Sequence, residues 1–459
     1  MPLRRHGTII SAVLIVCAIA AMLAAGVLFA IRAQTSSVTA SRSGSHAYLA
    51  AWSGLNEAMA MFNSGDVPVA EWYDNPQLFQ NRLVAVEDGE AWCFTIYAHN
   101  PLDNSQPRFG LTDEASKILL DDESAKLLIG EANMTDELVD CLVDYLDEDD
   151  ETSAVGAERD YYASLEPPYL PRNGPLETVE ELLLIKGFSG RIVFGEDFNL
   201  NGVLDSNEFD GDDSFPPDDR NDVLDTGLAG IATVNAWEYD VDSQGRPRVN
   251  INGDVAELEN LGLPQETVDF ILAYRQAGKT FSHPSQLLGM TYRPESPSQN
   301  LEIEEISSGV DESNLAQVLD VLTVRTSGRQ PIRGLVNINT APQRVLRLLK
   351  GFDDDLAGRI VDARRDLSSD KKSSIAWLVE ENVVDFEKFK EIAPVLTARS
   401  FQFRLRCVGF GAKTGSFCAI EAVFDVSQGR PRLVYMRDIS RLGLPVAIDV
   451  DQEMLGAMR

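Results

Sequence analysis

The stretch GTIISAVLIVCAIAAMLAAGVLFAIR, residues 7–32, has no charged side chain from Thr8 to Ile31. These about 24 residues would form a helix roughly 36 Å long, enough to cross a hydrocarbon core. The apolar region of a secretory signal is shorter, about 7–15 residues. Two arginines precede the run, so the positive-inside rule places the N-terminal end in the cytoplasm and the chain after Arg32 outside it. The sequence therefore predicts a single-pass membrane anchor.

The helical pattern continues beyond this apolar run, over residues 41–62. Small and apolar residues recur there at helical spacing and give the helix one apolar face. They are Ala47, Ala50, Ala51, Leu55, Ala58, Met59 and Phe62. The sequence Asn63-Ser64-Gly65 is typical of a helix end. We expect one long helix, first apolar and then amphipathic, over residues 8–63.

Strand-like segments stand on either side of the long middle of the chain. Residues 84–86 and 91–98 are rich in β-branched and aromatic residues. Three further strand-like segments follow between Phe401 and Ile439, joined by turns that contain glycine. The pattern predicts an α+β fold, in which the long N-terminal helix packs on an antiparallel sheet and a large all-α domain is inserted between the strands.

The middle of the chain contains an internal repeat. The sequence VNIN at residues 249–252 recurs at residues 336–339, and each copy precedes two predicted helices joined by a short turn. Glycine, as at Gly351, allows such a turn to be tight. This helix-hairpin-helix pattern can bind DNA phosphates through backbone N–H groups, or it can serve as a packing unit. Three aspartates, residues 353–355, follow the second turn, so we favour the packing unit.

Three shorter patterns predict local structure in the inserted domain. Residues 136–145 form an amphipathic helix, with an inward face made by Leu138, Cys141, Leu142 and Tyr145. Thr178 is expected to cap another helix, with Glu181 at the capping-box position. The sequence RIVFGE, residues 191–196, indicates a strand.

The loop DFNLNGVLDSNE, residues 197–208, fits the calcium-loop spacing D-x-[DN]-x-[DN]-G-x5-E without a mismatch. Its glycine, Gly202, allows the sharp bend, and its hard oxygen donors suit Ca²⁺ better than zinc or copper. The expected donors are Asp197, Asn199, Asn201, the carbonyl of Val203, Asp205 and Glu208. Because the flanking sequence does not indicate paired helices, we expect a calcium loop outside an EF-hand. The alternative is an Asx-rich turn in an acidic protein.

A second, degraded copy of the loop follows, with Asp219, Asn221 and Asp225 at the same relative spacing and Val223 at the carbonyl position. Asp222 replaces the glycine. Proline occupies the first ligand position, so Asp210, Asp212 or Asp213 would have to contribute. The sequence leaves open whether the segment 197–225 binds one ion or two.

The composition argues against several classes of function. The net charge is −32 and the pI is about 4.4, so the surface repels phosphate backbones, which argues against nucleic acid as the main partner. The four histidines have no metal or triad spacing, and no glycine loop for phosphate is evident, so we predict a protein that is not an enzyme. Cys407 and Cys418 lie on a predicted strand pair and could form a disulfide or remain two separate thiols.

Two parts of the chain resemble a known family. A short basic leader that ends at Gly7 and continues into an apolar helix is similar to the N-terminus of type IV pilins and pseudopilins. The family usually has glutamate at the fifth mature position, which is Ala12 here. The block CLVDYLDEDD, residues 141–150, followed by GAERDYYASLEPPYLPRNGPLETVEELLLIKG, residues 156–187, resembles the protein K family of the type II secretion system, which are minor pseudopilins.

The resemblance implies a division of the chain and a function. It implies a prepilin leader (1–7) cut by a prepilin peptidase between Gly7 and Thr8, and a helix (8–63) in the inner membrane. Pilin-body strands (64–110), an inserted helical domain (111–396) with calcium loops at 197–225, and C-terminal pilin-body strands with a tail (397–459) would lie in the periplasm. The family role is to cap the tip of the pseudopilus with minor pseudopilins I and J and to aid export of folded proteins. The alternatives are a membrane-anchored DNA-uptake protein and a type IV pilus tip adhesin.

Overall fold

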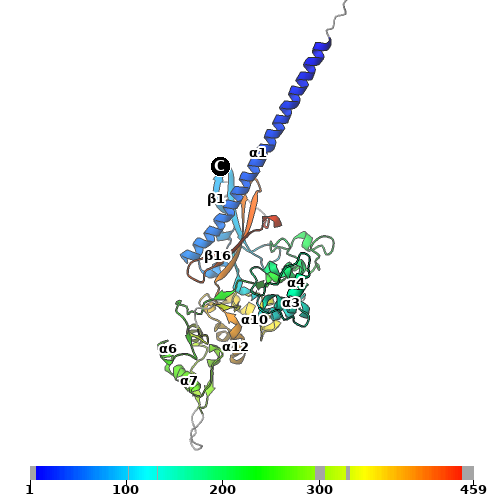
Figure 1. Cartoon of the computed structure of the whole chain (residues 1–459). Helices are drawn as coiled ribbons and strands as arrows, with labels where there is room; N and C mark the ends of the chain where they lie inside the picture. The colour runs from blue at the N-terminus through cyan, green and yellow to red at the C-terminus, as the bar shows by residue number, and fades with distance from the viewer. Residues whose placement is uncertain (1–6, 102, 132, 295–304, 327–330, 447–459) are drawn as a thin grey trace, which may run out of the picture.

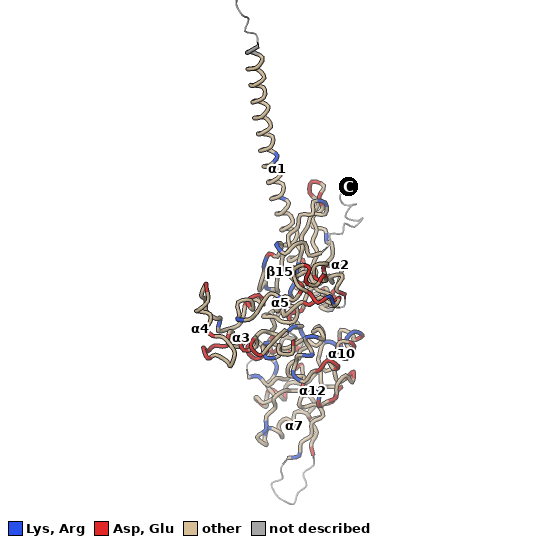
Figure 2. The backbone as a smooth tube through the Cα atoms, turned by 90° about the vertical axis from the view of Figure 1, so that its right-hand side faces the viewer, with Lys and Arg blue, Asp and Glu red and all other residues tan. Residues whose placement is uncertain are grey.

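A single long helix, α1 (Gly7–Ser64), forms the stem of the molecule (Figure 1). The structure, a computed structural model, describes residues 7–101, 103–131, 133–294, 305–326 and 331–446. Among the described helices, α1 is long and apolar enough to cross a membrane by length and composition. Its upper half projects away from the rest of the protein and bears no Lys, Arg, Asp or Glu before Arg32 (Figure 2). The expected continuous helix is therefore confirmed.

The lower half of α1 packs on a six-stranded antiparallel sheet. The strand order is β1-β2-β14-β15-β16, and β3 also pairs with β14. The strands are β1 (Arg82–Glu87), β2 (Glu90–Tyr97), β3 (Thr112–Asp113), β14 (Gln402–Gly411), β15 (Phe417–Asp425) and β16 (Arg432–Asp438). Short helices complete this body: η1 (Val69–Trp72), α2 (Pro76–Phe79) and η11 (Ser440–Leu442). The predicted α+β fold is present.

Small residues allow the backbone of α1 to approach the sheet closely. A side chain at Gly409 of β14 would place its Cβ 2.2 Å from the carbonyl oxygen of Ala47 and from the amide nitrogen of Ala51. In the same way, a Cβ at Gly54 would lie 2.5 Å from Sγ of Cys407. Leu55 and the alanines of the predicted face are buried in this interface, which explains why so much of the face is alanine.

The inserted domain leaves the sheet after β3 and returns at β14. Asp113 and Phe403 are paired across the two strands, so the entry and exit of the insert lie side by side. Its α-helices are α3 (Asp136–Leu146), α4 (Arg159–Ala163), α5 (Gly190–Phe194), α6 (Val255–Glu259), α7 (Gln265–Gln276), α8 (Leu315–Val321), α9 (Gln343–Leu346), α10 (Asp354–Ala363), α11 (Trp377–Glu380) and α12 (Phe386–Ile392). Its 3-10 helices are η2 (Glu114–Ser116), η3 (Ser124–Gly130), η4 (Val179–Leu184), η5 (Ser206–Glu208), η6 (Leu228–Gly230), η7 (Pro284–Leu287), η8 (Arg364–Asp366), η9 (Lys371–Ser373) and η10 (Ala393–Val395).

The insert is not all-α, which corrects the sequence-based expectation. Two-residue strands pair within it, and they give backbone groups in buried connections their hydrogen-bond partners. The pairs are β4 (Ile118–Leu119) with β5 (Ala232–Thr233), β6 (Trp237–Glu238) with β11 (Ile332–Arg333), β7 (Val249–Asn250) with β10 (Leu322–Thr323), β8 (Thr291–Tyr292) with β9 (Ile306–Ser307), and β12 (Val336–Asn337) with β13 (Leu396–Thr397). Strands this short have no alternating pattern for the sequence to reveal.

Most local predictions for the insert agree with the structure, and one is wrong. The four inward residues predicted for α3 are all buried, and helix pairs α6–α7 and α9–α10 follow the two VNIN copies. Thr178 and Glu181 form the predicted capping box, although the helix they cap, η4, is a 3-10 helix. The predicted strand at 191–196 is instead helix α5, because Val193 packs into the insert core and tertiary contacts override β propensity.

A buried network of charges joins the insert to the sheet. Arg404 on β14 contacts Glu114 of the insert (2.8 Å) and Glu421 on β15 (2.9 Å). Arg406 also pairs with Glu421 (2.8 Å). Arg437 on β16 bridges Glu421 (3.0 Å) and Glu180 of the insert (2.6 Å). These arginines hold the pKa of Glu421 well below its usual range despite burial, so the interface depends on ionised partners.

Candidate metal centre

The predicted calcium loop, residues 197–208, is called loop 1. It follows α5 after Gly195, which has a φ of 65°. A Cβ at Gly195 would lie 2.2 Å from the carbonyl oxygen of Asp225, so glycine permits two backbone segments to meet there. Gly202 has a φ of 71°, the left-handed conformation predicted for the bend of the loop. Loop 1 therefore has the backbone turn that the sequence spacing requires.

Polar side chains of loop 1 converge on Asp205. The amide groups of Asn199 and Asn201 both donate to Oδ2 of Asp205, at 2.7 and 2.9 Å. Oδ1 of Asn201 accepts from the amide of Val203 (2.7 Å), and Oδ1 of Asp197 accepts from the amide of Gly202 (3.3 Å). The two neutral asparagine amides thus donate hydrogen bonds to a carboxylate whose charge a bound cation would balance.

Glu208 is the clearest sign of a cation-binding loop. It is 1% exposed, and its Oε1 has no hydrogen-bond partner among the described residues, while Oε2 accepts from the amide of Asp205 (3.0 Å). Burial, and after it the charges of Asp197 and Asp205, raise the pKa of Glu208 to about 7. Burial also raises the pKa of Asp197. Carboxylates held together at this energetic cost are suited to hard cations such as Ca²⁺.

The degraded copy, residues 219–225, is called loop 2, and its backbone repeats that of loop 1. Leu200 and Gly202 have φ values of 57° and 71°, and the corresponding residues Arg220 and Asp222 have values of 56° and 62°. The amide of Val223 donates to Oδ1 of Asn221 (2.7 Å), as the amide of Val203 does to Asn201. Asp222 therefore adopts the conformation of the glycine that it replaces.

Loop 2 differs from loop 1 in its electrostatic partners. Oδ1 of Asp225 pairs with Arg344 (3.1 Å), which already supplies a positive charge. Asp219 and Asn221 are exposed, and the amide of Asn221 donates to Oδ2 of Asp219 (2.9 Å). Glu196 lies close to both aspartates, whose charges add to burial in raising its pKa. Loop 2 offers oxygen donors, but it is the weaker candidate.

Two of the three other acidic residues expected near loop 2 have protein partners. The carboxylate of Asp210 accepts from the amide and hydroxyl of Ser214 (3.1 and 2.6 Å). Asp213 pairs with Arg220 (3.5 Å). Asp212 is exposed.

The sequence pattern missed Glu196, which joins the two loops. Its amide donates to the carbonyl of Asp225 (2.7 Å), and its Oε2 accepts from the amide of Asp225 (3.2 Å). The sequence signal for Glu196 was its position immediately before Asp197. The calcium-loop spacing begins at Asp197, so that pattern does not select Glu196.

Loop 1 lies against the antiparallel sheet and the segment after β2, which the sequence did not indicate. Arg406 of β14 donates to the carbonyl of Leu200 (2.7 Å), and Nδ1 of His99 lies 3.0 Å from the carbonyl of Gly202. The backbone carbonyl of Asn104 accepts from the amide of Leu204 (2.8 Å). The side-chain amide of Asn104 donates to the carbonyl of Asp222 (3.1 Å). The loop is therefore a joint between the insert and the sheet.

The remaining predicted features have definite positions. Gly7 and Thr8 form the first residues of α1, and residues 1–6 of the leader lie outside the described residues. Cys407 and Cys418 are thiols and are not joined by a disulfide. Sγ of Cys407 lies 3.4 Å from the carbonyl of Ala51, whereas Sγ of Cys418 lies 3.5 Å from Oγ of Ser440.

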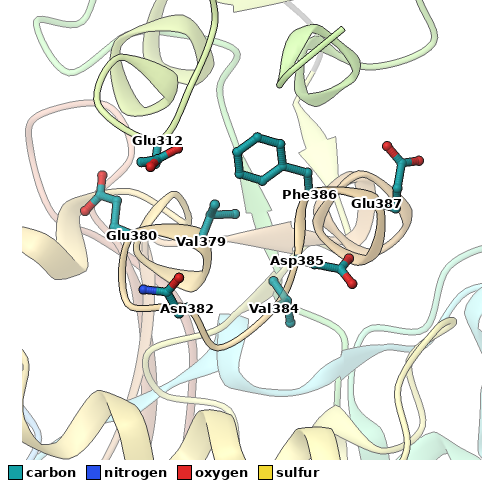
Figure 3. A pocket seen from close by; sticks show the side chains of 8 residues that line it. All are labelled: Glu312, Val379, Glu380, Asn382, Val384, Asp385, Phe386 and Glu387. Atoms are coloured by element: carbon teal, nitrogen blue, oxygen red, sulfur yellow. The ribbon is translucent and has the colours of Figure 1, made fainter.

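A separate pocket lies between the loop at Glu312 and helices α11 and α12 (Figure 3). It is lined by Glu312, Val379, Glu380, Asn382, Val384, Asp385, Phe386 and Glu387. None of these lining residues is basic. The pocket therefore has no charge partner for a phosphate or another anion.

Comparison with known proteins identifies the first part of the insert. Residues 117–194 match the family described as type II secretion system (T2SS), protein K. Among solved structures, a chain of the GspK-GspI-GspJ complex from the type 2 secretion system of enterotoxigenic Escherichia coli aligns at 12% identity with a TM-score of 0.36. The alignment covers 89% of this chain and 98% of that chain, a likeness too distant to carry an argument. No curated protein sequence matches this chain.

Proposed function

Since residues 117–194 belong to the protein K family of the type II secretion system, we propose that this chain is a minor pseudopilin that caps the tip of the periplasmic pseudopilus. Its role is structural and not catalytic. The chain would act with minor pseudopilins I and J to aid export of folded proteins across the outer membrane. This choice of partners follows from the match of residues 117–194 to protein K of the type II secretion system.

The position of the insert supports a capping role. The apolar half of α1 extends from one end of the pilin body, and the insert lies at the opposite end (Figure 1). If subunits pack through helices like α1, a domain at the far end would obstruct a further subunit above it. Ala12 offers no carboxylate for the amine of a subunit above, which agrees with a terminal position.

The tip position can be tested by labelling. An epitope inserted after Gly245, in an exposed turn of the insert, should be detected at one end only of isolated pseudopili. Co-purification with I and J is expected from the same preparation. A label distributed along the filament would contradict the capping role.

We also propose that a prepilin peptidase cuts the chain between Gly7 and Thr8. The body beyond Arg32 would then lie in the periplasm, with α1 anchored in the inner membrane. The intact mass after co-expression with the peptidase should correspond to a chain that begins at methylated Thr8. A chain that retains residues 1–7 would contradict processing.

Loop 1 is proposed to bind Ca²⁺ through Asp197, Asn199, Asn201, Val203, Asp205 and Glu208. The observation that supports this is a buried oxygen of Glu208 beside two other carboxylates, which has no hydrogen-bond partner in the part of the chain that the structure describes. Because loop 1 contacts β14 and the segment after β2, the ion would stabilise the joint between insert and sheet. Loop 2 is a weaker second site, with Asp219, Asn221 and Asp225 as donors.

A further inference from the structure

The two copies of the VNIN repeat each begin a small helical lobe. Lobe A (residues 249–294 and 305–323) is closed by the parallel pair β7–β10, and lobe B (residues 336–397) is closed by the parallel pair β12–β13. The pocket of Figure 3 lies between the lobes, because Glu312 belongs to lobe A and its other lining residues belong to lobe B. Its volume of about 450 Å³ is typical of ligand pockets, which often form between domains.

The floor of this pocket is apolar. Val379 and Val384 are buried, at 5% and 8% exposed, and Phe386 is half-buried. A Cβ at Gly289 of lobe A would lie 2.8 Å from Cδ2 of Phe386, so glycine allows the ring to lie against lobe A. The ring is therefore placed where the two lobes meet, and it points toward Val379 and Glu312 (Figure 3).

The rim of the pocket is acidic, and two of its four carboxylates have partners within α12. The side chain of Asp385 caps α12 by accepting from the amide of Lys388 (2.8 Å). Glu387 pairs with Lys390 (2.8 Å). In Figure 3 the carboxylates of Asp385 and Glu387 both point away from the pocket floor. These two acids are therefore not the ones that a ligand would meet.

The other two carboxylates, Glu312 and Glu380, come from different lobes and lie on the same side of the pocket (Figure 3). Both residues are exposed, and neither carboxylate has a hydrogen bond or an ion pair among the described residues. Lys371 pairs with Glu381, which raises the pKa of Lys371 more than the charge of Glu380 does. Two carboxylates thus flank an apolar pocket without a positive partner in the described part of the chain.

The loops that carry these two carboxylates are held by hydrogen bonds. On lobe A, the carboxylate of Asp311 accepts from the amide and the hydroxyl of Ser313 (2.9 and 2.6 Å). On lobe B, the amides of Val383 and Val384 both donate to the carbonyl of Leu378 (2.9 and 3.1 Å). The pocket is therefore preformed, and a ligand would bind it with little loss of backbone entropy.

We propose that this pocket binds an arginine side chain presented by a basic segment of a partner protein. The methylene stem of the arginine would pack on the two valines, and its guanidinium would stack on Phe386 and face Glu312 and Glu380. A metal ion would leave the apolar floor unused, and the rim would repel a phosphate. The net charge of −32 would also attract a basic partner over a distance. The site depends neither on calcium binding nor on the tip-capping role, so a failure of either leaves it unaffected.

The test is the binding of a short peptide of alternating glycine and arginine, labelled with a BODIPY fluorophore, to the full chain in detergent. Fluorescence anisotropy at about 0.15 M salt gives the Kd, since this salt screens distant charges. The key variant is Glu312→Gln with Glu380→Gln. The matched control is Glu257→Gln with Glu259→Gln, which removes the same charge at exposed positions of α6 outside the pocket. We expect Kd to rise about fivefold in the pocket variant and less than about twofold in the control.

The same peptide with citrulline in place of arginine keeps the shape and removes the charge, and we expect it not to bind. An equal change of Kd in the two double variants would overturn the proposal, because the peptide would then respond only to the net charge of the chain. Equal binding of the two peptides, or no binding by the unmodified chain, would also overturn it. Circular dichroism shows whether the variants are folded. If the pocket variant is not, Glu312→Gln compared with Glu257→Gln decides in its place.

Discussion

At the scale of single residues, glycine decides how closely the stem packs on the sheet. Gly409 and Gly54 bring two backbones into contact, and no larger side chain fits at Gly409 without moving α1. Gly44 lies in α1, as Gly54 does, but a Cβ at Gly44 would meet no atom within 4 Å. The same substitution at the two positions should therefore have opposite effects.

We expect Gly409→Ala to lower the free energy of unfolding by about 2–3 kcal/mol through overpacking. Gly44→Ala should raise it by about 0.5–1 kcal/mol, because alanine loses less entropy than glycine in a helix. Denaturant unfolding of the full chain in detergent measures both. Equal effects of the two changes would show that α1 is not held by this close contact.

Asp113 is a second residue whose surroundings change a measurable property, in this case the pKa of its carboxyl group. It lies on β3, where the insert begins, and accepts from Asn337 (3.0 Å), from Thr340 and from Ser400 near the end of the insert. Burial outweighs these donors and raises the pKa of Asp113 to about 6, from an unfolded value of about 3.8. The folded state therefore holds this proton more tightly than the unfolded state.

The sign of the resulting pH dependence follows from that difference. The contribution of Asp113 to stability is fully present below about pH 4 and is lost as the pH rises through about 6. Asp113→Asn cannot titrate, so the unfolding free energy of the unmodified chain minus that of the variant should fall by about 2.4 kcal/mol from pH 4 to pH 7. Unfolding curves at several pH values measure this difference, and parallel profiles would contradict the shifted pKa.

At the scale of elements, the sequence predicted what depends on local spacing. The left-handed backbone at Gly202 and the capping box of Thr178 and Glu181 each arise within a few residues, and both are present. Glu196 and Arg406 were missed, because their contacts join segments far apart in the chain. Val193 lies in a helix although its sequence favours a strand, since packing in the insert core outweighs intrinsic propensity.

Loop 1 gives the prediction that belongs to this scale. Removing calcium with a chelator should lower Tm, because free calcium at 100 times its Kd contributes about 2.7 kcal/mol. At about 2–4 °C per kcal/mol for a large domain, this corresponds to about 5–11 °C. Glu208→Gln should reduce the shift, and Glu257→Gln, at an exposed position in α6, should not. Differential scanning calorimetry with and without chelator is the measurement. A Tm that is independent of calcium would remove the structural role of the ion.

At the scale of the whole molecule, the sequence indicated the stem, the sheet and a helical insert between strands. It did not indicate that β3 at Thr112–Asp113 belongs to the sheet, because a two-residue strand carries no period. Nor did it indicate the charge network around Glu421, since its arginines come from alternate positions of β14 and from β16. These contacts fix the insert on the sheet, and they follow from topology and not from any local pattern.

Because the two ends of the insert lie close together, the role of the insert can be tested separately from that of α1 and the sheet. Because Asp113 pairs with Phe403, residues 116–399 can be replaced by a short Gly/Asn turn that joins β3 to β14 as a hairpin. We expect this variant to keep α1 and the sheet, and to enter pseudopili without ending them, because the obstruction beyond the sheet is gone. When the new turn carries the epitope, the label should then appear along the filament, and pseudopili should be longer, as seen by electron microscopy. The full chain with the same turn inserted after Gly245 is the control. A deletion variant still confined to one end would place the capping function in α1, where Ala12 lacks the carboxylate, and not in the insert.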